Sequence, residues 1–335
     1  MPDTSLPPCH GLLWARRLDR PEILDEAAVT AILSRGVPPM ELWLHFDLRD
    51  LRAHRFLQAL PGLPPQARAA LDERAEMAHL DTEGRALWGT LPDFHYEALE
   101  TPDPLQMGIL HVALAPGLLV TARRHPLRAP QLAGEEHVSA ETAAQQWDIM
   151  LRAILDGIAR AAAALSQRLD GIEDRLLQDR PVGRTELARA RRDVLLLHRR
   201  VEPAAGIYEE IAEAAPAWLA PAGHDAERAA ARFASALRTI ASLRERGRIA
   251  QDDLAARTAE GTNQRLMVLS VLTAILLPPT LVTGFFGMNT TDLPGTSDPG
   301  GSWWAIAAML GAALLAVLVL TGLGFIRLRR GGARR

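Results

Sequence analysis

The sequence has a single cysteine, few aromatic residues and no excess of basic charge. Cys9 has no partner within the 335 residues, which excludes a disulfide scaffold and a zinc site built on several cysteines. A formal net charge of −3 and a pI near 6.4 exclude the basic excess that dominates nucleic-acid affinity, so we expect no nucleic-acid partner. The sequence also lacks a phosphate-binding glycine loop, a Walker motif and a Ser/His/Asp arrangement, which argues against an enzyme and against ATP-driven transport.

Charged residues are absent from two long segments near the C-terminus, Leu266–Phe286 and Trp303–Ile326. The mean hydropathy of +0.00 is therefore an average over a charged part and a very apolar part. About 20 helical residues at about 1.5 Å each cross the apolar core of a bilayer. The two segments are predicted to be transmembrane helices, and a buried core helix of a large soluble protein is the less favoured interpretation.

The flanks of the two segments predict how they are oriented. The loop between them, residues 287–302, carries Asp292 and Asp298 and no basic residue. Basic residues flank the other two ends: Arg257 and Arg265 precede the first span, and Arg327, Arg329, Arg330, Arg334 and Arg335 follow the second. The positive-inside rule places both termini in the cytoplasm and makes the chain a multi-pass protein of the cytoplasmic (inner) membrane. The N-terminus has no basic region followed by an apolar core, so we expect no cleaved signal peptide.

Residues 1–140 show the short mixed patterns of a cytoplasmic α/β domain. Glu41–Leu48 alternates apolar and polar side chains and predicts a half-buried strand. The turn at residues 115–117 (Ala-Pro-Gly) lies between two apolar runs, 107–114 and 118–124, and predicts a β-hairpin. Segments 24–36 and 65–77 favour helices.

Residues 141–265 show the sequence pattern of long helices. Apolar residues at a 3-and-4 spacing predict one helix from Trp147 to Leu176, ended by the Pro-Val-Gly sequence at 181–183, and a second from Leu187 to Ile211. A third run starts near Asp225 and meets no proline before Pro278. We therefore expect a stalk helix continuous with the first span. The overall prediction is an α+β membrane protein with an α/β domain (1–140), a long-helix and stalk region (141–265), two spans (266–286 and 303–326), an outer loop (287–302) and a basic cytoplasmic tail (327–335).

One face of the predicted stalk and first span forms a heptad seam. Its residues, at steps of 3 and 4, are Asp252, Ala256, Ala259, Asn263, Leu266, Ser270, Thr273, Leu277, Thr280 and Gly284. Within the membrane this seam is small and mildly polar, whereas large apolar residues lie elsewhere on the helix. Such a stripe faces other helices or water. The pattern leaves two interpretations open: close helix packing, or a pore built by several copies of the helix, since one chain with two spans cannot enclose a channel.

The first span ends in Gly287-Met288-Asn289. Gly287 permits a backbone turn at the membrane surface, and Asn289 offers an uncharged carbonyl oxygen. A ring of such amides suits a hard, still-hydrated cation, because oxygen dipoles replace or contact its water shell without the trapping that a ring of carboxylates would cause.

With this motif after the first span of a C-terminal hairpin, the sequence resembles the CorA superfamily of divalent-metal transporters, and within it the ZntB-like zinc transporter branch. The segments Trp43–Asp47 and Val120–Arg124 are similar to that branch, and Thr290–Gly295 lacks the Met-Pro-Glu loop of magnesium members. The resemblance implies a homopentamer that is in contact with membrane lipid and whose first spans line a central pore. Carried onto this chain, the pore-lining positions are Asp252, Asn263, Leu266, Leu277, Thr280 and Asn289, with Leu266 and Leu277 as hydrophobic constrictions.

Other candidates are weaker. His45 and Asp47 are two potential metal ligands on one strand face. Asp292 and Asp298 would concentrate cations at the pore mouth. Acids on the first long helix, such as Asp170 and Glu173, alternate with arginines and predict a salt-bridged surface, and Cys9 is expected in a mobile terminus.

We therefore expect a transporter of divalent cations, with zinc favoured as the cargo. The resemblance implies uptake driven by ion gradients and leaves coupling to protons open. No tightly bound cofactor is expected, and Zn²⁺ or Mg²⁺ is the cargo. The alternatives are a magnesium/cobalt channel of the CorA type and a membrane-anchored coiled-coil scaffold.

Overall fold

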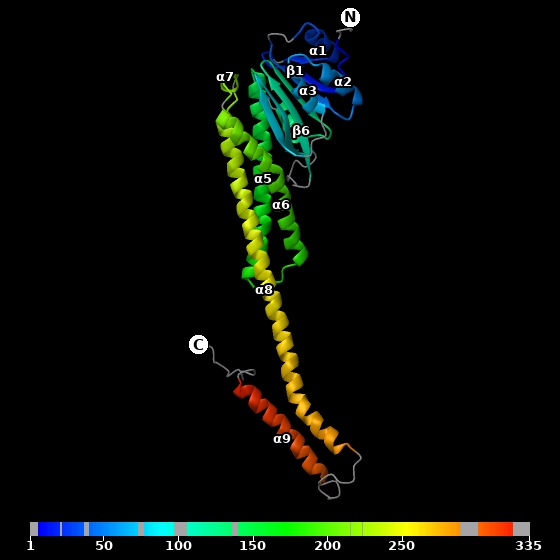
Figure 1. Ribbon diagram of the computed structural model, residues 1–335, viewed down its shortest axis with the longest axis vertical. Coiled ribbons are helices and arrows are strands. Elements are labelled where there is room, and N and C mark those ends of the chain that lie inside the picture. Colours follow the sequence, from blue (N-terminus) through cyan, green and yellow to red (C-terminus); the bar gives the residue numbers. More distant parts are fainter. Residues whose placement is uncertain are drawn as a thin grey trace. The chain divides into compact units, whose positions relative to one another are not determined.

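The structure is a computed structural model and describes residues 6–20, 22–36, 40–72, 77–96, 106–135, 140–214, 216–222, 224–288 and 301–323. The contacts divide the chain into two compact units, Met1–Gln251 and Asp252–Arg335. The first unit contains a sheet with helices on both faces and three long helical segments, and the second contains two apolar helical segments (Figure 1). The predicted α+β class is confirmed.

Among the described residues, the sheet of the first unit has seven strands in the order β2-β1-β3-β7-β6-β5-β4. Neighbouring strands are antiparallel except β3 and β7, which pair in parallel. The strands are β1 (Leu12–Arg17), β2 (Glu22–Leu24), β3 (Leu42–Asp47), β4 (His79–Glu83), β5 (Ala86–Phe94), β6 (Met107–Ala115) and β7 (Leu118–Arg123).

Helices cover both faces of this sheet. On one face lie α1 (Glu26–Leu33), α2 (Leu51–Ala59) and α3 (Pro65–Asp72), which share one apolar core with the strands. On the other lie α4 (Arg128–Glu135) and the start of α5 (Ala143–Leu177). The strand predicted at residues 41–48 is confirmed as β3, but the prediction that it is half-buried was wrong. Trp43 and His45 are buried as fully as Leu44 and Phe46, because β3 is a central strand covered from both sides.

The predicted hairpin is confirmed as β6 and β7, joined by the turn at Pro116-Gly117. Gly117 has φ +78°, and a Cβ there would lie 2.8 Å from the carbonyl oxygen of Met40. The turn therefore needs glycine for its backbone angle and for this close approach.

Cys9 is buried at 1% exposure in the core with α1 and α2, which corrects the expectation that it lies in a mobile terminus. Burial, and secondarily the charge of Glu26, raises the pKa of its thiol to about 12. The cysteine is therefore an inert apolar side chain of the core.

The long helices follow the predicted periodicity. The eight apolar residues that set the spacing of the first predicted helix are all buried on α5: Trp147, Leu151, Ile154, Ile158, Leu165, Leu169, Ile172 and Leu176. The four that mark one face of the second are all buried on α6 (Arg184–Ala214): Val194, Leu197, Val201 and Tyr208. Trp147 of α5 donates its indole N–H to the hydroxyl of Tyr208 on α6 at 3.1 Å. A short α7 (Leu219–Ala222) leads to α8 (Ala226–Phe286), a single helix that contains both the predicted stalk and the predicted first span.

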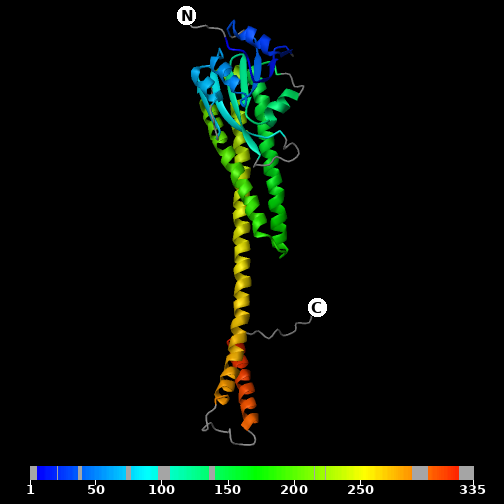
Figure 2. The ribbon, with the colours of Figure 1, turned by 90° about the vertical axis from the view of Figure 1, so that its right-hand side faces the viewer.

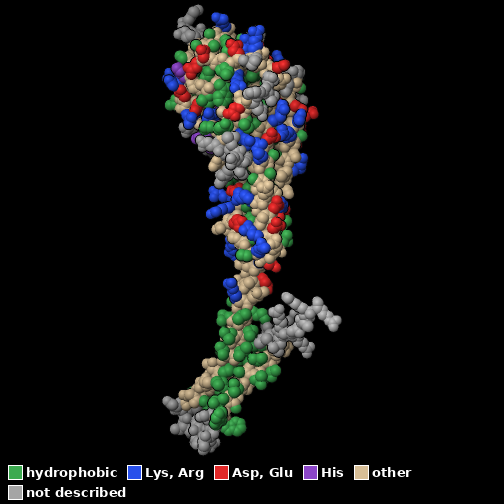
Figure 3. Space-filling view, turned by 180° about the vertical axis from the view of Figure 1, so that it is seen from behind, with side chains coloured by type: hydrophobic (Ala, Val, Ile, Leu, Met, Phe, Trp, Pro, Cys, Tyr) green, Lys and Arg blue, Asp and Glu red, His purple; other side chains and the backbone are tan. Residues whose placement is uncertain are grey.

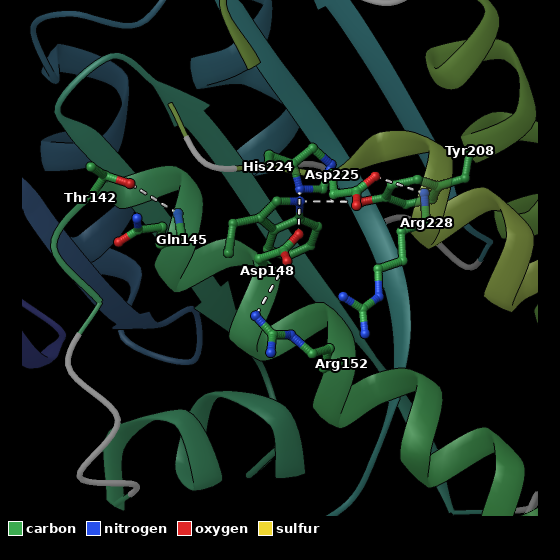
Figure 4. Close-up of polar contacts among 9 residues, drawn as sticks. Thr142, Gln145, Asp148, Arg152, Tyr208, His224, Asp225 and Arg228 are labelled. Carbon is green, nitrogen blue, oxygen red and sulfur yellow. Dashed lines mark hydrogen bonds and ion pairs between the residues drawn. The ribbon is translucent and has the colours of Figure 1, made fainter. Parts of the chain in front are cut away.

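The beginning of α8 is tied to α5 by a small polar cluster (Figure 4). His224 donates from Nδ1 to Asp148 Oδ1 at 2.8 Å, and Arg152 reaches the other oxygen of Asp148 at 3.4 Å. Asp225 accepts a hydrogen bond from the backbone N–H of Arg228 at 2.9 Å. This last contact satisfies an N–H at the helix start that has no partner within the helix.

Farther along α8, ion pairs join it to α5. Arg246 pairs with Asp170 and Glu173, and Arg232 pairs with Asp156 at 2.5 Å. The acidic residues of α5 thus form the salt-bridged surface that was predicted.

Candidate cation pathway

The second unit consists of the C-terminal part of α8 and of α9 (Gly301–Gly322). Both helices are long and apolar enough to cross a membrane, and none of the residues in their apolar windows is buried. A core helix of a soluble protein would be mostly buried, so the structure disfavours that interpretation. Figure 3 shows hydrophobic side chains over the surface of these helices, with few charges among the described residues. Such a surface is stable in lipid or against other apolar helices.

Every seam residue from Asn263 to Gly284 is exposed in this chain, and so is Asp252. The exposed fraction is 55% for Leu266 and 66% for Leu277. No part of the described chain covers the seam.

The partly buried residues of this part of α8 lie on another face. They are Val271, Ala274, Ile275, Pro278, Pro279, Val282 and Phe286. With about 100° of rotation per residue, the centre of this stripe lies about 150° around the helix from the centre of the seam. Half-buried residues of α9, including Ala305, Met309 and Ala316, recur at the same 3-and-4 spacing, and α9 runs back beside the end of α8 (Figures 1 and 2). The α8 face that meets α9 is therefore opposite the seam.

Threonine hydroxyls on the seam are fixed by their own helix. Thr273 Oγ1 donates to the carbonyl of Leu269 at 2.8 Å, and Thr280 Oγ1 donates to the carbonyl of Leu276 at 2.7 Å. Because the hydroxyl hydrogen is used in this bond, the oxygen lone pairs remain available as acceptors. Acceptor oxygens on an otherwise apolar helix suit a cation or its bound water.

The end of α8 is set by glycine. Gly287 donates its N–H to the carbonyl of Thr283 at 2.9 Å, and a Cβ at Gly287 would lie 3.0 Å from that oxygen. At Gly284 a Cβ would meet nothing within 4 Å. At position 287 the close carbonyl at the end of the helix therefore favours glycine, whereas nothing inside the described chain requires glycine at position 284. Met288 is 51% exposed, and Asn289, Asp292 and Asp298 lie outside the described residues.

The metal-ligand candidates on β3, His45 and Asp47, belong to the first unit. His45 is fully buried, its Nδ1 shares a hydrogen bond with Thr121 Oγ1 at 2.8 Å, and its ring stacks on Trp14. Burial, aided by the charge of Arg123, lowers the pKa of His45 to about 3, so the imidazole is neutral at physiological pH.

Asp47 is held in a bidentate ion pair by Arg49, with a closest distance of 2.7 Å. Among the described residues there is no group of three or more His, Cys, Asp or Glu side chains that could hold a metal. The structure thus brings no third ligand to His45 and Asp47 from the part of the chain it describes.

The combination of sheet domain, long helices and apolar hairpin matches a known family. The family described as CorA-like Mg²⁺ transporter protein matches residues 41–329. The chain belongs to the CorA family. As a CorA-family member it is a membrane transporter of divalent cations and not an enzyme.

Zinc transport proteins named ZntB are among the relatives of this CorA-family chain. The protein from Photorhabdus laumondii is 24% identical over 81% of this chain and 84% of its own length. The protein from Pectobacterium atrosepticum is 25% identical over 87% of this chain and 89% of its own length.

Two solved structures share the fold over nearly the whole chain. The full-length CmaX protein has a TM-score of 0.76 at 24% identity and covers 94% of this chain and 98% of its own. The CorA magnesium transporter from Methanocaldococcus jannaschii has a TM-score of 0.70 at 17% identity and covers 95% of this chain and 98% of its own.

Proposed function

We propose that this CorA-family protein moves zinc across the cytoplasmic membrane through a homopentameric pore. The observation that carries the proposal is the seam of α8: it is exposed, less apolar than its surroundings and opposite the face that meets α9. A small, mildly polar stripe inside lipid is costly unless it faces helices or water. If several copies of α8 surround a pore with their seams turned inward, each seam faces the other helices and the water of the pore.

Each part of the seam has a role in the proposed pathway. Asp252 and Asn263 contact the ion at the cytoplasmic side, and Leu266 and Leu277 are constrictions that close by excluding water. Ser270, Thr273, Thr280 and Gly284 line the path with hydroxyl oxygens and open space. At the outer end Asn289, presented by Gly287 and Met288, contacts the hydrated ion. In the loop beyond, Asp292 and Asp298 raise the local cation concentration.

The proposed placement in the membrane follows the charge asymmetry of the sequence. Residues 266–286 and 303–326 span the bilayer, residues 287–302 form the outer loop, and the α/β domain (1–140), the long-helix region (141–265) and the tail (327–335) are cytoplasmic.

Zinc is favoured over magnesium by the names of the relatives, which span more than four fifths of this chain, and by the absence of a Met-Pro-Glu loop after Asn289. Only one cysteine is present, so thiolates do not hold the ion in the path, and oxygen ligands release it more readily. A magnesium channel of the CorA type is the second candidate, favoured by the description of the matching family. Coupling of zinc uptake to protons is part of the proposal.

The test is metal uptake into proteoliposomes that contain a zinc-sensitive or magnesium-sensitive dye. We expect zinc flux that rises with an inward proton gradient, and we expect Asn289→Ala to abolish it while Thr291→Ala, in the same loop, does not. Magnesium flux without zinc flux would overturn the zinc assignment. Unchanged flux in Asn289→Ala would overturn the role of the motif, and no flux of either metal would favour a membrane-anchored scaffold.

Mass measurement in detergent tests the pentamer, because a monomer would be incompatible with the pore.

A further inference from the structure

A cavity of about 580 Å³ lies within the first unit, between the sheet and α6. One wall comes from β6 and from the residues just after β7, and the other from α6. Neither the seam nor the β3 residues contribute to it. Its residues come from segments far apart in the chain, so no local pattern in the sequence predicts that they share one cavity.

The lining of this cavity is strongly basic. It contains three guanidinium groups, Arg124, Arg199 and Arg200, and two imidazoles, His111 and His125. No Asp or Glu of the described residues lines it. An arginine keeps its charge at any physiological pH, so at least three positive charges surround one small space in a chain whose net charge is −3. These charges attract an anion that enters the cavity.

Arg124 and Arg199 retain donors for such an anion. Arg124 uses one of its N–H groups in a long hydrogen bond, 3.4 Å, to the carbonyl of Leu48. Arg199 is exposed and has no hydrogen-bond or ion-pair partner in the described part of the chain. The planar fork of guanidinium N–H groups matches the oxygens of a phosphate, to which arginine binds in a bidentate manner.

The size and the remaining walls indicate a small ligand. A volume of about 580 Å³ falls within the range of small-molecule sites, which is about 300–1,000 Å³. Met107, Ile109 and Leu196 add an apolar wall beside the basic groups, which would cover an organic part of the ligand. We propose that this cavity binds a small phosphate-bearing anion with several negative charges, such as pyrophosphate or a nucleoside di- or triphosphate.

The test uses the full chain in detergent with divalent metals removed by EDTA, so that its outcome does not depend on which cation is transported. The probes are sodium phosphate, pyrophosphate, ATP and adenosine, and binding is measured by calorimetry and by the shift of the unfolding temperature. We expect pyrophosphate and ATP to bind more tightly than phosphate, with affinity falling as sodium chloride is added. Tighter binding of ATP than of pyrophosphate would identify a nucleotide as the ligand.

The matched variants are Arg199→Gln and Arg192→Gln. Both remove one exposed arginine from the same face of α6, two turns apart, but only Arg199 lines the cavity. We expect Arg199→Gln to weaken ATP binding about tenfold or more, which is the usual effect of losing one charge-assisted hydrogen bond, and Arg192→Gln to leave it unchanged. Arg199→Lys should recover part of the affinity.

Three results would overturn the proposal: no binding of any anion, equal binding by the two glutamine variants, or binding of adenosine as tight as that of ATP.

Discussion

Replacing Gly284 with leucine separates the pore role of the seam from the folding of the chain. Gly284 lies on the seam of α8, and Gly311 lies on an exposed position of α9. At both positions a Cβ would meet nothing within 4 Å in the described chain. Gly284→Leu and Gly311→Leu are therefore matched substitutions in two apolar helices.

The structure sets the expected magnitudes. A Cβ at either position meets nothing within 4 Å in the described chain, and glycine is about 1 kcal/mol less favourable in a helix than a good helix former. We therefore expect neither variant to be less stable than the wild type. If copies of α8 surround a pore, each copy of Gly284→Leu adds one apolar side chain to the lining. A ring of such side chains excludes water from the path of a hydrated cation. We expect at least about a tenfold loss of flux, equivalent to a barrier increase of about 1.4 kcal/mol.

The assay is dye-reported zinc and magnesium uptake into proteoliposomes, normalised to the protein incorporated and accompanied by unfolding temperatures in detergent. We expect Gly284→Leu to lose flux while its unfolding temperature is no lower than that of the wild type, and we expect Gly311→Leu to transport as the wild type does. Wild-type flux in Gly284→Leu, or an equal loss in both variants, would refute the inward orientation of the seam.

Three further predictions concern the first unit. Gly117→Ala should destabilise the chain by about 1–2 kcal/mol in chemical denaturation, because of its positive φ and the close carbonyl, and Gly36→Ala, at an open position with positive φ, should cost less. Cys9, with a pKa raised to about 12, stays a thiol at pH 7–8 and should react with maleimide only after unfolding in urea; rapid labelling of the folded chain would contradict its burial. Arg246→Gln breaks two partly exposed ion pairs to α5 and should lower the free energy of unfolding by at most about 1 kcal/mol. Arg248→Gln breaks an ion pair with Glu245 on the same helix and should change the free energy of unfolding less; equal effects would argue against the α5–α8 ion pairs.

Local patterns in the sequence were enough to predict the long helices. The buried faces of α5 and α6 follow from apolar residues at 3-and-4 spacing, and the helix that continues from the stalk into the first span follows from the lack of proline before Pro278. The hairpin at Gly117 was also predictable, because a turn depends on adjacent residues.

Features that join distant segments were not predictable. The alternation in β3 indicates one buried face, but α4 and α5 cover the second face, and no pattern within six residues records that. The burial of Cys9 likewise depends on α1 and α2, which follow it in the chain.

The sequence by itself determined that two segments are apolar enough for a membrane, that a helix leads into the first, and that a small, mildly polar seam runs along it. These properties depend on composition and helical period, which neighbouring residues carry. Only the tertiary structure decided that the seam is opposite the face that meets α9, and that Arg124, Arg199 and Arg200 share one cavity. These facts depend on which surfaces are buried against each other, and that depends on contacts between segments that are distant in the sequence.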